Sequence, residues 1–195
     1  YRRQRQMCIR DRNSKEPLEK EAEKYVSEEK GVKNVQEAID GAKDILAENI
    51  SDEADYRKRI RDLTFKKGTL VSAAKDEKAE SVYEMYYDFT EAVSKVAGHR
   101  VLALNRGEKE KFLSVKIEAP EEEILRYLEK KVIRRDNPYT TPVLKEVVAD
   151  SYQRLIAPAI ERELRNELTE KAEDGAILVL SLIHISEPTR LGMIS

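Results

Sequence analysis

The 195-residue chain has no tryptophan, one cysteine (Cys8), two histidines, seven glycines and six prolines. A single cysteine excludes a disulfide scaffold and a thiolate zinc site. No apolar run is long enough to suggest a membrane-spanning helix. Basic residues (36) and acidic residues (38) almost balance, which excludes a strongly basic nucleic-acid-binding module. The length is sufficient for one moderate domain with a hydrophobic core.

The two ends of the chain differ in composition from the rest and are related to each other as DNA. Residues 7–12 can be back-translated as ATG TGT ATA AGA GAC AG, and the reverse complement of that DNA encodes residues 180–185. Such an inverted repeat is typical of a sequencing-library adapter. We therefore interpret residues 1–12 and 180–195 as adapter-derived tails that are not native, and residues 13–179 as the genuine segment. The alternative is a native basic arm at one end and a native strand at the other.

Residues 13–179 contain few of the residues and motifs that are typical of catalytic or metal-binding sites. This segment has 30 basic and 36 acidic residues, a net charge of −6, no cysteine and one histidine, His99. It has no compact carboxylate loop, no phosphate-binding loop and no dinucleotide fingerprint, so we expect no metal and no cofactor. His99 could activate Ser94 or Ser114, but no spacing fixes that geometry. The sequence therefore indicates a protein that is not an enzyme.

Apolar residues at helical spacing predict most of the secondary structure. A helix is expected over residues 17–27. Asn34, with Glu37 three residues later, predicts the start of a second helix. Ser51 predicts the start of a third, which ends at Gly68 after two lysines. A further helix is expected to follow Pro120 and to end before residues 136–138, where Asp, Asn and Pro form a turn.

The last helix is also predicted from helical spacing, whereas a strand is predicted from alternating apolar and polar residues. A long periodic run begins at residues 141–142, and Pro158 predicts a kink or a break in it. Alternating residues 113–118 predict one strand, whose partner is either residues 69–73 or residues 101–104, although residues 100–105 also suit a short helix. Residues 82–89 suggest one more helix. The predicted fold is mainly α, a multi-helix scaffold with a small two- or three-stranded β element.

Two clusters of basic residues are candidates for contact with RNA or DNA. The acidic net charge argues against broad attraction to phosphate, and basic residues near the carboxy-terminal end of a helix also complement its dipole. Both interpretations stay open. The first cluster lies at residues 57–67 and contains Arg57, Lys58, Arg59, Arg61, Lys66 and Lys67, and the second contains Lys130, Lys131, Arg134 and Arg135.

The densest local pattern is HRVLALNRGE at residues 99–108, in which an apolar centre is flanked by polar groups. Arg100 and Arg106 either present charge to a phosphate or a neighbouring domain, or pair with carboxylates while Gly107 provides a turn. The structural interpretation is favoured because arginine is common in ion pairs. The polar members of this motif are His99, Arg100, Asn105, Arg106 and Glu108, with Gly107 beside them.

Three stretches resemble the amino-terminal half of the bacterial Tex family of transcription accessory proteins. They cover residues 24–61, 83–110 and 161–177, and the sequences EAIDGAKDILAENISD and HRVLALNRGE are the most specific parts. The resemblance extends over residues 14–179. The chain departs from the family pattern at residues 91–92, where Glu-Ala replaces Glu-Pro, and at residues 97–98, where Ala-Gly precedes the His-Arg pair.

The resemblance implies a cytoplasmic, elongated and largely helical protein that associates with nucleic acid and the transcription machinery. In the family, this region is followed by a nuclease-like domain that is not thought to be catalytic, and then by helix-hairpin-helix and OB-fold modules that bind RNA. We therefore expect a fragment that serves as a helical scaffold and interdomain region of a nucleic-acid-binding parent. Its partners would be the downstream domains and, through the parent, RNA or DNA and transcription proteins. The alternative is that the segment itself binds nucleic acid through its basic clusters.

Overall fold

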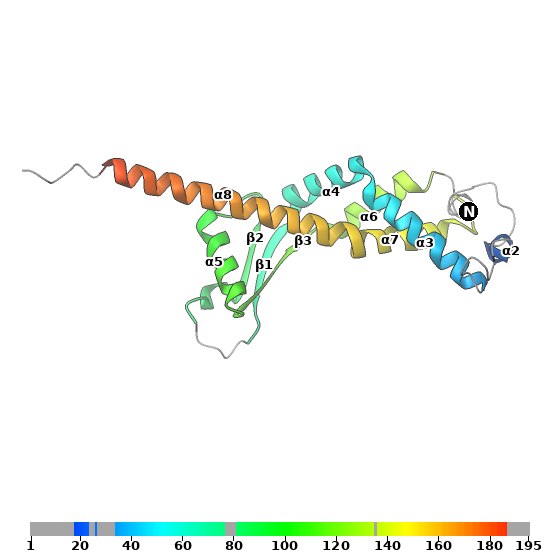
Figure 1. Ribbon diagram of the computed structural model, residues 1–195, viewed down its shortest axis with the longest axis horizontal. Coiled ribbons are helices and arrows are strands. Elements are labelled where there is room, and N and C mark those ends of the chain that lie inside the picture. Colours follow the sequence, from blue (N-terminus) through cyan, green and yellow to red (C-terminus); the bar gives the residue numbers. More distant parts are fainter. Residues whose placement is uncertain (1–17, 24–25, 27–33, 77–80, 135, 187–195) are drawn as a thin grey trace, which may run out of the picture. The chain divides into compact units, whose positions relative to one another are not determined.

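The computed structural model describes residues 18–23, 26, 34–76, 81–134 and 136–186 (Figure 1). The chain divides into two compact units. Residues 1–63 and 120–160 form the first unit, and residues 64–119 and 161–195 form the second. Helices dominate, and the strands form one three-stranded antiparallel sheet, which confirms the predicted fold class.

The first unit is helical. Its elements include α2, α3, most of α4, α6, α7, a π-helical turn labelled η3 and the beginning of α8. Their bounds are α2 Leu18–Glu23, α3 Val35–Asp52, α4 Ala54–Lys67, α6 Glu121–Val132, α7 Thr141–Asp150, η3 Ser151–Ile156 and α8 Ala157–Ser186.

Helix α3 begins where the sequence predicted. The Glu37 N–H donates to Asn34 Oδ1 at 2.8 Å, so the asparagine side chain satisfies one of the amino-terminal N–H groups that have no partner within the helix. The buried face of α3 contains several small residues, and this face packs against α7 and η3. Ala38 of this face also packs with Ala22 of α2. The buried residues of α3 are Ala38, Ala42, Leu46, Ala47 and Ile50.

Two predicted helix boundaries in this unit need correction. Ser51 does not begin a new helix, because its hydroxyl donates to the Glu48 carbonyl at 2.8 Å within the last turn of α3. The next helix begins at Ala54, and its first backbone bond joins Arg57 N–H to the Glu53 carbonyl at 3.1 Å. For the helix predicted over residues 17–27, the structure describes only α2 and Val26, which is not helical; the other positions lie outside the described residues.

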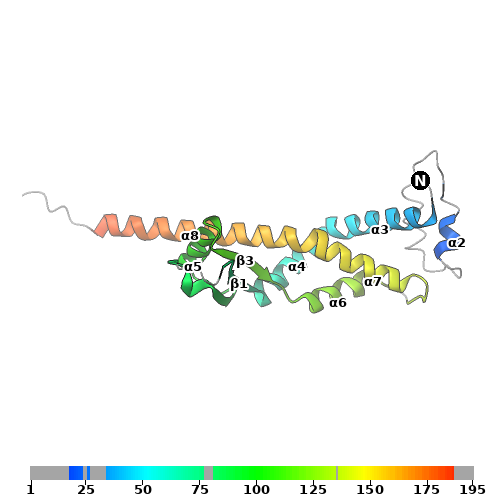
Figure 2. The ribbon, with the colours of Figure 1, turned by 90° about the horizontal axis from the view of Figure 1, so that it is seen from below.

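Helices α6 and α7 lie side by side (Figure 2), and a turn at residues 137–140 precedes α7. Ile124 and Leu128 of α6 are completely buried. The turn follows the prediction for residues 136–138: Asn137 Oδ1 accepts the N–H of Tyr139 at 2.9 Å, and the N–H of Asn137 donates to Thr141 Oγ1 at 2.9 Å. These bonds fix the direction in which α7 starts.

The chain stays helical through Pro158, so the break that the sequence allowed does not occur. Instead, the preceding residues of η3 form a π-helical turn, in which Ala157 N–H bonds to the Tyr152 carbonyl five residues earlier. Proline has no N–H for the carbonyl four residues before it, and a wider turn is one way to absorb that loss. The turn is tied to α3 because the buried Ser151 hydroxyl donates to the Ala47 carbonyl at 2.7 Å.

The ionisation of Tyr152 is expected to lower the stability of the first unit at high pH. Burial, with a smaller contribution from the Glu121 carboxylate, raises the pKa of Tyr152 from 10.0 to about 12. Between these two pH values the unfolded chain has lost the phenolic proton and the folded chain has kept it, so stability falls as the pH rises. We expect urea unfolding to show a loss of stability between pH 10 and pH 12 that Tyr152→Phe reduces. Tyr139→Phe, at an exposed tyrosine, is the control, and equal pH dependence in both variants would contradict the expectation.

The second unit contains the sheet. Its strands are β1 Thr69–Ala74, β2 Asp88–Ala92 and β3 Leu113–Glu118, in the order β2-β1-β3. Strand β1 is therefore central, and Val71 lies opposite Thr90 on one side and Lys116 on the other. Of the two partners considered for β3, residues 69–73 are the correct one, because residues 101–104 belong to helix α5, Gly98–Lys109.

The helix predicted over residues 82–89 is wrong. Only Glu84–Tyr86 form one short 3-10 turn, η2, and β2 starts at Asp88. Val82 and Met85, whose spacing suggested one face of that helix, are 84% and 74% exposed. The stretch contains three tyrosines and one phenylalanine, which favour strands, and pairing with β1 determines the outcome.

The core of the second unit lies between the sheet, helix α5 and α8. In Figure 1 the sheet and α5 lie against the same stretch of α8. At the start of α5, a Cβ on Gly98 would lie 3.1 Å from the Cα of Ala172, so the absence of a side chain allows close contact between the two helices. The core residues are Leu70, Tyr83, Tyr86, Val93, Val101, Leu104, Leu113, Val115, Leu168 and Ala172.

Beyond Ala172 the described side chains of α8 are exposed, through residue 182. The helix includes residues 180–186, which belong to one of the predicted adapter tails; the tail at residues 1–12 and the rest of the other, at residues 187–195, lie outside the described residues. The exposed apolar residues here are Ile177, Leu178, Val179, Leu180 and Leu182.

Candidate functional site

The candidate cations of α4 fall into two groups. Arg57, Lys58 and Arg61 belong to the first unit. Arg57 and Arg61 are half-buried and both interact with other groups of the chain, whereas Lys58 is exposed. Lys66 and Lys67 belong to the second unit and are exposed in the last turn of α4, where positive charge complements the helix dipole.

The two arginines of the HRVLALNRGE motif have different surroundings. Arg100 donates to Glu91 of β2 at 2.7 Å, and its guanidinium lies 5.9 Å from the centre of the Phe89 ring. Arg106 is exposed, and its charge opposes the rise in the pKa of Tyr83 that burial and the Glu110 carboxylate cause. Arg100 is therefore engaged within the unit, while Arg106 faces solvent.

The other polar members of the motif connect α5 with α8. Asn105 donates to Thr169 Oγ1 at 2.8 Å, and its own side-chain oxygen accepts from Arg165 at 3.4 Å. Arg165 also forms a two-pronged ion pair with Glu108, one prong of which measures 3.1 Å. The sequence interpretation missed Arg165 and Thr169, although their four-residue spacing places them on one side of the helix, beside its buried face.

Gly107 does not provide a turn, contrary to the prediction. It is a buried residue within α5, and a Cβ at this position would lie 2.6 Å from Leu113 Cδ1 and 3.2 Å from Tyr83 Cδ1. Glycine is needed here because the helix approaches β3 closely. His99, in the first turn of α5, is exposed, and within the described part of the chain no hydrogen bond joins it to Ser94 or Ser114.

Side chains of α8 also bind the outer edge of β3. Glu161 Oε1 accepts the N–H of Ile117 at 3.0 Å, and Arg165 donates to the carbonyl of Val115 at 3.3 Å. Since β3 pairs with β1 only on its other side, these two backbone groups would otherwise lack a partner in the sheet. The helix thus closes one edge of the sheet.

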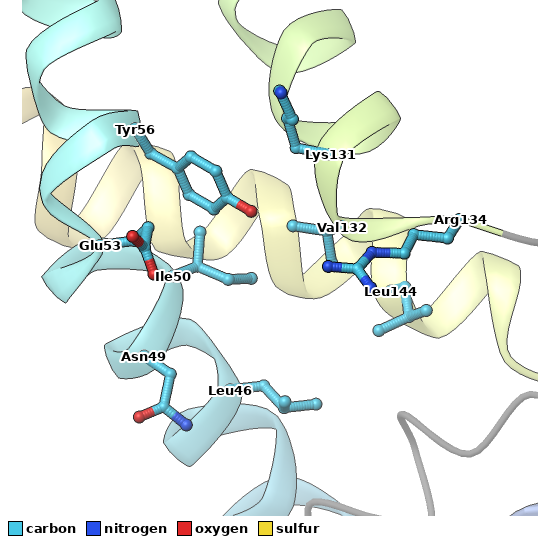
Figure 3. Close-up of a pocket in the computed structure, with 9 residues that line it drawn as sticks. All are labelled: Leu46, Asn49, Ile50, Glu53, Tyr56, Lys131, Val132, Arg134 and Leu144. Carbon is cyan, nitrogen blue, oxygen red and sulfur yellow. The ribbon is translucent and has the colours of Figure 1, made fainter.

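A pocket of about 390 Å³ lies in the first unit (Figure 3). Its floor is apolar and consists of Leu46, Ile50, Val132 and Leu144. Polar side chains surround this floor, and most of them are exposed. They are Asn49 and Glu53 from the end of α3, Tyr56 from α4, and Lys131 and Arg134 from the end of α6 and the residues after it.

No group of three or more histidine, cysteine, aspartate or glutamate side chains among the residues that the structure describes could hold a metal ion. None of the helices in the described ranges is long and apolar enough to cross a bilayer.

Comparison with known proteins assigns the family. Residues 13–180 match a family model described as Tex central region-like. The chain therefore belongs to the Tex family, as the resemblance indicated.

Relatives of the chain occur in bacteria and in humans. Protein YdcI of Bacillus subtilis is 53% identical over 163 residues, which are 82% of this chain and 23% of that protein. The human S1 RNA-binding domain-containing protein 1 is 30% identical over 77% of this chain and 16% of its own length. Transcriptional accessory protein Tex of Neisseria gonorrhoeae is 27% identical over 84% and 22%. The chain spans less than a quarter of each of these relatives.

Proposed function

We propose that this chain acts as the helical scaffold and interdomain region of a transcription accessory protein that binds nucleic acid and works in the cytoplasm. The family match and the names of two relatives, one a transcriptional accessory protein and one an S1 RNA-binding domain-containing protein, support this role. In this view RNA or DNA and transcription proteins are partners of the longer protein, and no cofactor or membrane takes part.

The main support for this proposal is that polar side chains of the HRVLALNRGE motif bond to other residues of the second unit. Arg100, Asn105 and Glu108 all direct their polar groups at other parts of the second unit, where they hold α5 to β2 and α8. Side chains that are occupied in this way stabilise a rigid body and are not free to bind phosphate. Such a body suits a segment whose task is to position neighbouring domains.

Direct binding of nucleic acid by this chain is the second candidate function. Lys58, Lys66 and Arg106 are exposed and have no ion pair among the described residues. Each of them could contact phosphate, as could Arg57, Arg61 and Lys67, whereas Arg100 would first have to exchange its carboxylate partner. Binding of this kind would weaken steeply with salt, because each phosphate contact releases counterions.

A gel-shift titration with 30-nucleotide RNA and DNA probes at two salt concentrations separates the two functions. The scaffold predicts no shift at protein concentrations up to about 10 µM at either salt concentration. Direct binding predicts a shift at low salt that is lost at high salt and in a variant with Arg57→Ala, Lys58→Ala and Arg61→Ala.

The amino-terminal tail needs its own control, because it is rich in arginine and lies outside the described residues. A full-length variant with Arg2→Gln, Arg3→Gln and Arg5→Gln removes most of that charge. A shift that disappears in this variant comes from the tail and leaves the scaffold proposal intact. A shift that persists there but disappears in the α4 variant contradicts the scaffold proposal.

A further inference from the structure

The pocket of the first unit places a positively charged group above an apolar floor. In Figure 3 the Arg134 guanidinium points toward the middle of the pocket and lies between Val132 and Leu144. The Tyr56 ring enters from the opposite side with its hydroxyl directed inward. Both groups can donate hydrogen bonds to an acceptor in the pocket.

Within the described residues Arg134 has no carboxylate partner. Glu53 lines the same pocket but forms no ion pair with it. The Lys131 ammonium is directed away from the centre and lies 6.0 Å from the centre of the Tyr127 ring. The pocket therefore contains one guanidinium directed inward that has room for an acidic group.

The charges of the lining favour a single negative charge. Lys131 and Arg134 are opposed by Glu53, which leaves a net charge of +1. The carboxy-terminal end of α6, at Val132, adds partial negative charge from its last carbonyl groups. A phosphate with two negative charges suits this balance less well than a carboxylate, which matches the planar guanidinium through two parallel hydrogen bonds.

The exposed rim favours a polypeptide over a small molecule. Small-molecule sites bury most of their ligand, whereas Asn49, Glu53, Lys131 and Arg134 are all exposed here. A volume of about 390 Å³ accommodates one or two side chains of a larger partner. Asn49 of α3 and Glu53, the residue that follows α3, can then bond to the partner's backbone.

We propose that this pocket docks an acidic and apolar segment of a partner protein, with a carboxylate bound by Arg134 and Tyr56 and a neighbouring apolar side chain on the floor of Leu46, Ile50 and Leu144. The charge complementarity of the pocket carries the proposal. It goes beyond the scaffold role and does not depend on whether the chain binds nucleic acid.

The test is a nuclear magnetic resonance titration of the full ¹⁵N-labelled chain with two capped tripeptides, acetyl-Leu-Glu-Leu-amide and acetyl-Leu-Gln-Leu-amide. The acidic peptide is expected to shift amide signals of the pocket residues with a Kd on the order of 1 mM. The neutral peptide is expected to bind about tenfold more weakly, because it lacks the charge-assisted hydrogen bonds.

Arg134→Gln is expected to remove the preference for the acidic peptide. Arg126→Gln is the matched control, since Arg126 is an exposed arginine of α6 that pairs with Glu122 and does not line the pocket. Thermal unfolding of both variants should match that of the unmodified chain, because both side chains are exposed.

Four outcomes would overturn the proposal. Equal binding of the two peptides, an unchanged preference in Arg134→Gln, or the absence of pocket shifts at about 10 mM peptide would each do so. Pocket shifts would also be absent if a segment of this chain already occupied the pocket, and this case would overturn the proposal as well. The fourth outcome is competition by adenosine monophosphate. If it displaces the acidic peptide from the pocket at a concentration below that of the peptide, the site binds nucleotides instead.

Discussion

Replacement of Leu128 by alanine is expected to lower the free energy of unfolding of the first unit by about 2–5 kcal/mol. Leu128 is completely buried in α6, the helix that packs beside α7. Truncation removes its apolar surface from the core and leaves a cavity that the surrounding helices fill only in part. Urea unfolding followed by circular dichroism measures the loss, and hydrogen exchange should place the loss of protection in α3, α6 and α7.

Leu125→Ala is the matched control for this experiment. It makes the same chemical change on the same helix, but Leu125 is only half-buried. A smaller loss of stability is expected, because less apolar surface leaves the core and little cavity remains. Equal losses in the two variants would show that α6 is not buried on the Leu128 side.

Removal of the Arg165 side chain is expected to have the second-largest effect, a loss of about 1–3 kcal/mol in the second unit. Arg165→Ala leaves Glu108 without its partner and removes the bonds to Asn105 and to the carbonyl of Val115. The side chain of Arg165 is 24% exposed, so water compensates for part of this loss. The measurement is the change in urea midpoint.

Arg162→Ala provides the comparison for Arg165, because Arg162 is an exposed arginine on the same helix. It is expected to change stability by less than about 0.5 kcal/mol. A double-mutant cycle with Glu108→Gln should give a coupling energy of about 0.5–3 kcal/mol with Arg165→Ala. Additive losses would mean that the ion pair contributes nothing to stability.

The parts of the fold that the sequence predicted correctly are those that depend on neighbouring residues. The start of α3 follows from Asn34, whose side chain bonds within the same turn. Strand β3 follows from its alternating pattern, and α6 from Pro120 and the spacing of Ile124 and Leu128. Each of these signals lies within the element that it predicts.

Two of the errors occur where packing against another element determines the structure. The apolar spacing of residues 82–89 suits a helix, but β1 offers a strand edge that only an extended segment can pair with. Gly107 was expected to form a turn, and its actual role depends on the close approach of Leu113 of β3 and of Tyr83. The third error, at Ser51, is local: serine suits a helix start, but its hydroxyl bonds backward to the Glu48 carbonyl of the same helix, α3.

The candidate site was only partly visible in the sequence. Arg134 and Lys131 were recognised as part of a basic cluster, but the pocket that they line is completed by Leu46 of α3 and by Glu53 directly after it, about 80 residues earlier in the chain. The role of Arg165 was missed for a similar reason, because Glu108 and Val115 belong to elements far from α8 in the sequence. Spacing along one helix does not show which partners its side chains meet.

The bonds that Glu161 and Arg165 make to β3 limit how the sheet can associate with another sheet. Growth into a fibril by strand addition requires each molecule to offer two unpaired strand edges. In this unit α8 occupies the outer edge of β3, so the sheet order β2-β1-β3 leaves at most the edge at β2. Association through strand pairing of this sheet would therefore end with two molecules, and a variant that frees the edge of β3 would lose that protection.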